Sequence, residues 1–306
     1  MDTMRKHIEN YLEYCSTQKC LDEKTLKAYR IDLRQFCEQV PVAQIAQVTP
    51  LLLETYIAEL HQRYKPRTVK RKIASVKALF HYFEYREFID RNPFGRIQIR
   101  FREPVILPKT IPLHTVETFL STIYRQQTNA STAHQKRNAL RDAAVAELLF
   151  ATGMRISELC MLKDNDVDLQ EGTVLIYGKG DKERCIQIGS EAVLLVLKQY
   201  RSAFSSEIRS GRHFFVNQCG KAISDQSVRR MINKYTDLAS IELHITPHMF
   251  RHTFATCLLD ADVDIRIIQE LLGHSSIHIT EIYTHVAVAK QRDVLLAKHP
   301  RKDLHV

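Results

Sequence analysis

The chain has 306 residues, of which 44% are hydrophobic and 26% charged, and this balance excludes wholesale disorder. Only 9 glycines are present, which argues against glycine-rich phosphate loops, collagen-like repeats and a many-turned β fold. The net charge of +9 favours a polyanionic partner. We therefore expect a mainly helical protein of two domains that binds nucleic acid.

Neither a membrane segment nor a disulfide framework is indicated. No run of about 18 apolar residues occurs, and the first residues lack the apolar region of a signal peptide. The 7 cysteines include no C-x-x-C pair. We expect free thiols in a reducing cytoplasm and no membrane partner.

Residues 1–100 show the apolar periodicity of consecutive helices. The predicted helices cover 3–17, 23–39, 49–63 and 66–87, and prolines fall in or beside the gaps between them. Residues 1–106 hold 19 Lys and Arg against 13 Asp and Glu, which is most of the positive excess of the chain. This part is therefore predicted to be a helical N-terminal domain whose charge favours a polyanionic partner.

The fourth of these helices carries a basic stretch. Between Glu59 and Glu84 the sequence has no acidic residue, while its apolar residues recur at helical spacing. A solvated charged face is the plain alternative for such a run, but uncompensated cations beside an apolar stripe favour contact with a nucleic acid. The residues predicted to make this contact are Arg67, Lys70, Arg71, Lys72 and Lys77.

A proline-rich segment separates this region from a second domain. Ile97 to Leu113 contains three prolines and no clear period, so the linker is placed at 101–113 and the second domain at 114–306. Helices are expected again from Thr115, and the helix over 139–151 is predicted to end at Gly153.

The second domain also contains a β signal. Two β-rich runs in Gly172–Gly189 flank a Gly-Lys-Gly-Asp turn, which predicts a β-hairpin with a lysine at its tip, and Phe214–Val216 is a candidate third strand. A dinucleotide loop at Gly178 is not favoured because no third glycine and no helix follow. Further helices are predicted at 225–238, 247–260, 263–272 and 276–286. The fold class is mainly α with a small antiparallel β-sheet.

The helix over 247–260 carries two polar residues on one face. Thr246 and Pro247 form a typical N-cap and first-turn pair, and His248 and Arg251 then lie three residues apart, near the end of the helix that favours a phosphate. His252 follows His248 by four residues, but the glutamate of a zinc-binding H-E-x-x-H motif is missing. A zinc site is therefore not favoured.

Three further residues stand in suggestive places. Arg155 follows the helix break at Gly153, His274 follows Gly273 at the end of a predicted helix, and Tyr283 lies nine residues later among polar and β-branched side chains. Each of these residues has an ordinary structural explanation when it is taken alone.

Taken in order, six residues resemble the catalytic set of the tyrosine recombinase (phage integrase) family: Arg155, Lys179, His248, Arg251, His274 and Tyr283. The blocks ATGMRISEL, YGKGDKER, TPHMFRHTFAT and ELLGHSSIHITEIYTHV are similar to those of its XerC/XerD-like members. The resemblance extends through the N-terminal part, so it covers nearly the whole chain. It implies a SAM-like, core-binding N-terminal domain and a mixed α/β catalytic domain.

The resemblance implies a role for each residue, and the side-chain chemistry agrees. Arg155 and Arg251 would bind the phosphate oxygens, since guanidinium groups are planar and permanently charged. Tyr283 would be the nucleophile and His248 its base. Lys179, with Lys182 as the alternative, would protonate the leaving 5′ oxygen. His274 would donate a hydrogen bond to the phosphate, and no metal or other cofactor would be needed.

Partners follow from the same resemblance. Strand exchange requires double-stranded DNA and four protomers on two DNA sites, and the tail 287–306 is the segment expected to dock on a neighbouring protomer. A second recombinase or an accessory protein is a further possible partner. Two alternatives stay open: relaxation of DNA in the manner of a type IB topoisomerase, and a non-catalytic DNA-binding regulator.

Overall fold

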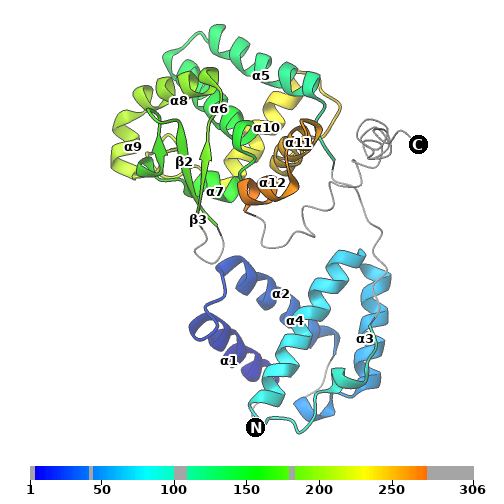
Figure 1. Cartoon of the computed structure of the whole chain (residues 1–306). Helices are drawn as coiled ribbons and strands as arrows, with labels where there is room; N and C mark the ends of the chain where they lie inside the picture. Colours follow the sequence, from blue (N-terminus) through cyan, green and yellow to red (C-terminus); the bar gives the residue numbers. More distant parts are fainter. Residues whose placement is uncertain (1–3, 41–43, 100–108, 179–182, 274–306) are drawn as a thin grey trace, which may run out of the picture. The chain divides into compact units, whose positions relative to one another are not determined.

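The structure is a computed structural model, and it describes residues 4–40, 44–99, 109–178 and 183–273. The chain divides into two compact units, Met1–Val105 and Ile106–Val306 (Figure 1). Each unit has its own hydrophobic core. Most of the predicted linker at 101–113 falls outside the described residues, so its limits stay a prediction. The mainly helical fold with a small antiparallel sheet is confirmed.

The described residues of the first unit form four helices and two short 3₁₀ turns. The helices are α1 (Met4–Thr17), α2 (Glu23–Gln39), α3 (Pro50–Arg63) and α4 (Pro66–Tyr85), and the turns are η1 (Ile45–Gln47) and η2 (Pro93–Arg96). Their starts are set locally, because Asp22 and Thr49 accept hydrogen bonds from backbone N–H groups of the first turn. The four helices predicted from the sequence agree with these bounds to within a few residues.

A buried carboxylate joins α2 to α4 in this unit. Asp32 is fully buried, and its carboxylate accepts hydrogen bonds from Arg71, from Lys72 at 3.3 Å and from the Ser75 hydroxyl at 3.0 Å. Lys72 also donates to Gln35. A buried charge is costly unless it is paired, so this network fixes how the two helices pack.

The network predicts a large stability difference between two acidic residues of α2. Asp32→Ala would leave the buried Lys72 ammonium without its counter-charge, so the free energy of unfolding should fall by about 3 kcal/mol. Glu38→Ala is the matched control, because the Arg34–Glu38 pair is 70% and 55% exposed, and it should cost no more than about 0.5 kcal/mol. Urea unfolding monitored by circular dichroism measures both values, and equal losses would contradict the assignment.

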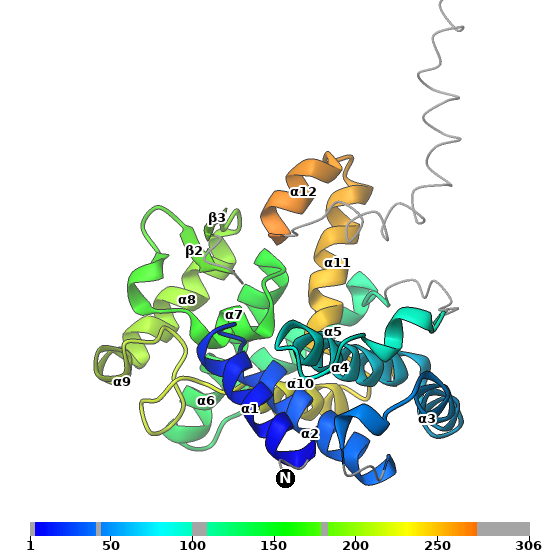
Figure 2. The ribbon, with the colours of Figure 1, turned by 90° about the horizontal axis from the view of Figure 1, so that it is seen from below.

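The second unit is built around one long helix. α6 (Ala133–Thr152) is buried on most of its faces and packs against α5 (Leu113–Thr128), α8 (Glu191–Ala203) and α11 (Pro247–Asp260). Figures 1 and 2 both show α12 (Ile265–Leu272) beside α11. The other helices are α7 (Ile156–Met161), η3 (Asp164–Asp166), α9 (Ser205–Gly211) and α10 (Asp225–Leu238).

The sheet of this unit has three antiparallel strands in the order β1–β2–β3. They are β1 (Val167–Asp168), β2 (Thr173–Tyr177) and β3 (Glu183–Gln187), and Val174 pairs with Ile186 on the buried face. The hairpin prediction is confirmed, since β2 and β3 are its two strands.

Some expectations from the sequence need correction. Phe214–Val216 is not a strand of the sheet: its side chains are fully buried in the core, and Val216 forms only an isolated bridge with Ala222. The helices α7, α8 and α9 were not predicted. The predicted helix over 276–286 lies outside the described residues. Among the helices that the structure describes, none is both long and apolar enough to cross a membrane.

Candidate active site

The start of α11 is fixed by the backbone. Thr246 occupies the N-cap position and Pro247 the first turn, as predicted, but the Thr246 side chain makes no capping hydrogen bond. Instead, the backbone N–H of Met249 donates to the Thr246 carbonyl oxygen at 2.9 Å. The predicted N-cap and first-turn pair is therefore confirmed, with the Thr246 carbonyl oxygen accepting the first bond of the helix.

Arg251 lies inside the unit, with only 4% of its surface exposed. Its guanidinium donates to the carbonyl oxygen of Gly153 at 2.9 Å and to that of Leu272 at 2.6 Å. A buried guanidinium requires such partners. Arg251 therefore joins α11 to the end of α6 and to the end of α12.

The chain bends sharply between α6 and α7. Gly153 has a left-handed backbone, with φ of 58°, and confirms the predicted helix end. A Cβ atom at this position would lie 2.6 Å from the Phe254 ring, so any other residue would be both strained and crowded. The bend places Arg155 at the N-cap of α7, where its side chain is 35% exposed.

Glu158 is the centre of a charge cluster beside this bend. Its carboxylate accepts hydrogen bonds from the backbone N–H of Arg155 at 2.7 Å and from the Arg155 guanidinium at 2.8 Å. The Arg184 guanidinium donates to its two oxygens at 3.1 and 2.6 Å. Burial alone would raise the pKa of Glu158, but the hydrogen bonds from Arg184 and Arg155 outweigh it and hold that pKa below its usual value.

Arg184 also bonds to a third element. It lies in β3, and its Nε–H donates to the carbonyl oxygen of Leu271 at 2.8 Å. Neither Glu158 nor Arg184 was predicted from the sequence. The one sequence signal was the position of Glu158, three residues after Arg155, which is the spacing of a helix-capping glutamate.

The two histidines of α11 differ in environment. His248 is exposed near the start of the helix, whereas His252 is partly buried one turn later. Burial, together with the nearby His248 and Arg251, lowers the pKa of His252 to about 4. Within the described ranges, no three His, Cys, Asp or Glu side chains are grouped as ligands of a metal ion.

A buried contact connects the start of the second unit to α11. The backbone N–H of Ile111 donates to the Thr253 hydroxyl at 2.8 Å, and both residues are 2% exposed. Thr253 in turn donates to the Met249 carbonyl oxygen at 2.8 Å. The segment that leads into this unit is thus bonded to the helix that carries His248 and Arg251.

Three of the predicted catalytic residues, Lys179, His274 and Tyr283, lie outside the described residues, as does Lys182. β2 ends at Tyr177, two residues before Lys179, and α12 ends at Leu272, two residues before His274. The bond from Arg251 to Gly153 places α11 beside the bend that carries Arg155, and His248 lies on the same helix as Arg251. The other three residues remain predictions.

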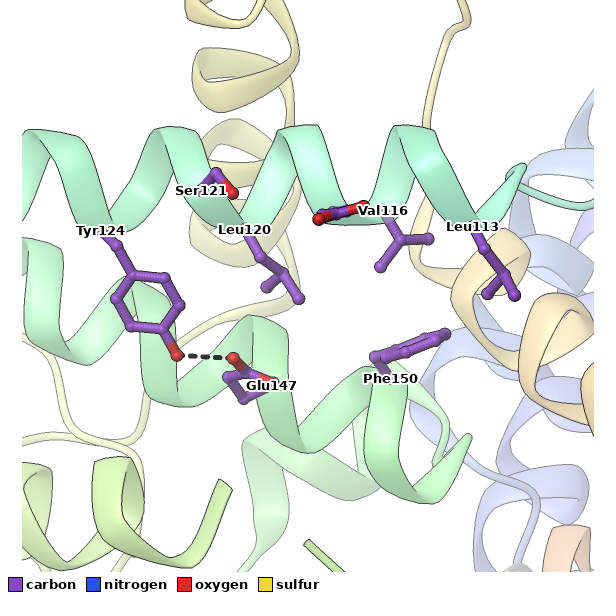
Figure 3. Close-up of a pocket in the computed structure, with 8 residues that line it drawn as sticks. Leu113, Val116, Leu120, Ser121, Tyr124, Glu147 and Phe150 are labelled. Atoms are coloured by element: carbon purple, nitrogen blue, oxygen red, sulfur yellow. Dashed lines mark hydrogen bonds between the residues drawn. The ribbon is translucent and has the colours of Figure 1, made fainter. Parts of the chain in front are cut away.

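A cavity between α5 and α6 is lined by residues other than the candidate catalytic residues. It has a volume of 270 Å³ and is lined mainly by apolar side chains, with Tyr124 donating a hydrogen bond to Glu147 (Figure 3). Glu117 is a second acidic residue of its lining. Two carboxyl groups would repel a phosphate, so this cavity is not a candidate DNA-binding site.

The predicted DNA-binding residues of α4 separate into two groups. Arg67, Lys70, Arg71 and Lys77 are exposed, and at 100° per residue they lie on one face of the helix. We call these four residues the basic face. Lys72 points elsewhere: it is 2% exposed, bonded to Asp32 and placed 4.9 Å from the centre of the Tyr64 ring. Its burial contradicts a role as a surface contact to DNA.

Comparison with known proteins identifies the family. A profile of the phage integrase family matches residues 121–290, and one of the N-terminal SAM-like domain of phage integrases matches residues 8–87. The chain belongs to the phage integrase family. The resemblance noted from the sequence is confirmed.

Individual relatives agree with the family. A tyrosine recombinase from Agathobacter rectalis is 64% identical to this chain over 305 residues, which are 100% of both proteins. Tyrosine recombinase XerD of Listeria innocua is 35% identical over 308 residues, covering 97% of this chain and 100% of that protein. The chain is thus a site-specific recombinase, an enzyme that cleaves and rejoins DNA strands.

Solved structures share the fold. The XerH site-specific recombinase bound to its difH substrate, in a pre-cleavage complex, matches with a TM-score of 0.73 at 22% identity. The match covers 97% of this chain and 85% of that one. A lambda integrase dimer bound to a core site matches with a TM-score of 0.70 at 16% identity, covering 92% and 77% of the two chains.

The partly buried histidine predicts a pH dependence of stability. His252 has a pKa of about 4 in the folded protein, against an ordinary value of 6.5, so the unfolded state binds a proton first as the pH falls. Between about pH 6.5 and pH 4 this difference should remove about 2 kcal/mol from the free energy of unfolding. Urea unfolding at both pH values should show a smaller loss for His252→Gln, since that side chain does not titrate. An identical loss in the two proteins would disprove this source of the pH dependence.

Proposed function

We propose that this recombinase cleaves DNA with Tyr283 as the nucleophile and that Arg155 and Arg251 bind the scissile phosphate. The observation that carries the proposal is the hydrogen bond from Arg251 to the Gly153 carbonyl oxygen, two residues before Arg155. This bond brings two arginines that are far apart in the sequence to one bend of the chain. Guanidinium groups suit the extra negative charge of the phosphoryl transition state, because they are planar and permanently charged.

The reaction is a displacement at phosphorus. The Tyr283 oxygen forms a bond to the phosphorus atom, and the bond from phosphorus to the 5′ oxygen breaks. The tyrosine proton passes to His248, which lies exposed one turn before Arg251. Lys179 gives a proton to the departing 5′ oxygen. The 3′-phosphotyrosyl link keeps the phosphodiester energy, so a new 5′ hydroxyl can reverse the step and rejoin the strands.

His274 completes the proposed set as a donor to a phosphate oxygen. Its assignment, like those of Lys179 and Tyr283, rests on the family resemblance and on position in the sequence. Tyr177 and Tyr235 are the other tyrosines considered as nucleophiles. Tyr235 is fully buried and donates to Asp142 at 3.1 Å, and burial raises its pKa, so it is poorly suited to attack.

The substrate is double-stranded DNA, and the basic face of α4 is its proposed contact in the first unit. Solved structures of relatives include a lambda integrase tetramer on a Holliday junction and the XerH complexes with difH. By analogy, we propose a tetramer of this chain on two DNA sites, joined through the tail 287–306, with a second recombinase or an accessory protein as an additional partner.

Action at the chromosome would place the protein in the cytoplasm. The topoisomerase and regulator alternatives are not favoured by the relatives.

The nucleophile is tested by removing one oxygen atom. Tyr283→Phe should bind DNA as the unchanged protein does but form no covalent complex, because only the hydroxyl is removed. The substrate is a duplex that the protein itself selects from a randomised pool, made with a nick that traps the cleaved product. Covalent complex is measured by denaturing gel electrophoresis, with Tyr177→Phe as the control that should still react. Cleavage by Tyr283→Phe would show that another residue is the nucleophile.

The basic face is tested by the salt dependence of DNA binding. Replacing Arg67, Lys70 and Lys77 by alanine should weaken binding to all sequences and reduce the slope of log K against log salt by about 0.9 for each phosphate that is no longer bound. Arg34→Ala is the control, since Arg34 is an exposed arginine of α2 that pairs with Glu38. An unchanged slope in the triple variant would show that the basic face is only solvated.

A further inference from the structure

We propose that Arg184 is a positioning residue that holds the Glu158 carboxylate and thereby leaves the positive charge of Arg155 available to the scissile phosphate. The inference rests on the proposed function and deepens it, because it adds a residue that the family resemblance did not supply. Its evidence is the cluster formed by Arg155, Glu158 and Arg184.

The two arginines that contact Glu158 differ in how far their side chains are buried. The Arg184 side chain is 10% exposed, and it donates to both oxygens of Glu158. The Arg155 side chain is 35% exposed and donates to one oxygen, from one guanidinium nitrogen. The inner arginine therefore takes the paired, two-point contact, which is the stronger form of this interaction. The outer arginine is the one at the surface, where DNA arrives.

The charges of the cluster explain why the inner arginine matters. Arg155, Glu158 and Arg184 together carry one net positive charge. Without Arg184, Glu158 and Arg155 would form a neutral pair, and the carboxylate would compete with the phosphate for the same guanidinium. A site that stabilises an anionic transition state would then lose charge at the point where it is needed.

Arg184 has a second contact that supports the same role. Its Nε–H donates to the Leu271 carbonyl oxygen at 2.8 Å, while Arg251 donates to that of Leu272, so two arginines hold the end of α12. A Cβ atom on Gly273 would lie 3.0 Å from the Arg184 guanidinium, which shows how closely the chain passes over it. β3, α7 and the end of α12 therefore meet at this one side chain.

The test measures single-turnover formation of the covalent complex on the nicked, self-selected duplex. Arg184→Gln should react about 10- to 100-fold more slowly, the range seen when a partner that orients a functional ligand is removed, with DNA affinity unchanged. Arg137→Gln is the matched control, because Arg137 pairs with Glu207 elsewhere in the same unit and should react at the unchanged rate. Thermal unfolding is recorded for each variant to show that it is folded.

A double variant separates charge from simple packing. Glu158→Gln combined with Arg184→Gln removes both charges and leaves Arg155 cationic, and the glutamine oxygen still accepts the backbone N–H of Arg155. The double variant should therefore react faster than Arg184→Gln alone. A packing role predicts the opposite, since two defects would add, so a double variant that is as slow or slower overturns the inference.

Arg184→Lys provides the variant that is least disturbing to the fold. It keeps the charge but offers a single donor group, so its rate should lie between those of the unchanged protein and Arg184→Gln. If Arg184→Lys and Arg184→Gln both react at the unchanged rate, Arg184 has no positioning role, although the proposed function still holds. If the unchanged protein forms no covalent complex, the proposed function fails and the inference fails with it.

Discussion

A carboxylate that is removed from water must be paired with cations and hydrogen-bond donors, and Glu158 imposes that requirement on the second unit. Its partners are Arg155 and Arg184, and Arg184 extends the network to the Leu271 carbonyl oxygen. Arg251 adds bonds from α11 to the carbonyl oxygens that flank the same region. Directional bonds therefore join the end of α6, α7, β3, α11 and the end of α12. Apolar packing alone would fix their distance but not the orientation of two guanidinium groups.

The first unit uses the same physical rule for a different purpose. Asp32 is buried and neutralised by Lys72 and Arg71, so part of the positive charge of α4 is paired with a carboxylate inside the unit. The other cations of the helix, Arg67, Lys70 and Lys77, are exposed and share the basic face with Arg71. One helix thus supplies both the counter-charge of a core and a surface for a polyanion. The net charge of a sequence segment therefore overestimates the number of cationic side chains that a partner can contact.

The sequence predicted elements best where apolar periodicity and end signals agreed. The bounds of α2, α10 and α11 match the predicted ranges, and each begins after Asp, Ser or Thr at the N-cap. α7 and α9 were missed because helices of 6 and 7 residues are too short to show a period. Phe214–Val216 had the composition of a strand, yet its full burial comes from packing in the helical core. Local composition does not distinguish these two kinds of burial.

The candidate site shows a similar limit. Arg155, His248 and Arg251 could be named in advance because the sequence around them resembles a family, not because any period joins them. Lys72 was misassigned because the charge of a residue does not reveal which side of a helix faces a buried acid. Arg184 was missed because its partner Glu158 lies 26 residues away and is reached through the sheet. Pairings of this kind depend on tertiary structure and leave no local signal.

The bond between Ile111 and Thr253 has a mechanical consequence. The chain enters the second unit at a residue that is bonded to α11, so a pull on the connecting segment is delivered first to that helix. Thr253 lies two residues from Arg251, and the intervening helix is stiff on this scale. A displacement of Ile111 would therefore reach the arginine that is bonded to Gly153 and Leu272 through less than one turn of α11. The start of the second unit is anchored beside a residue that is proposed to bind the phosphate.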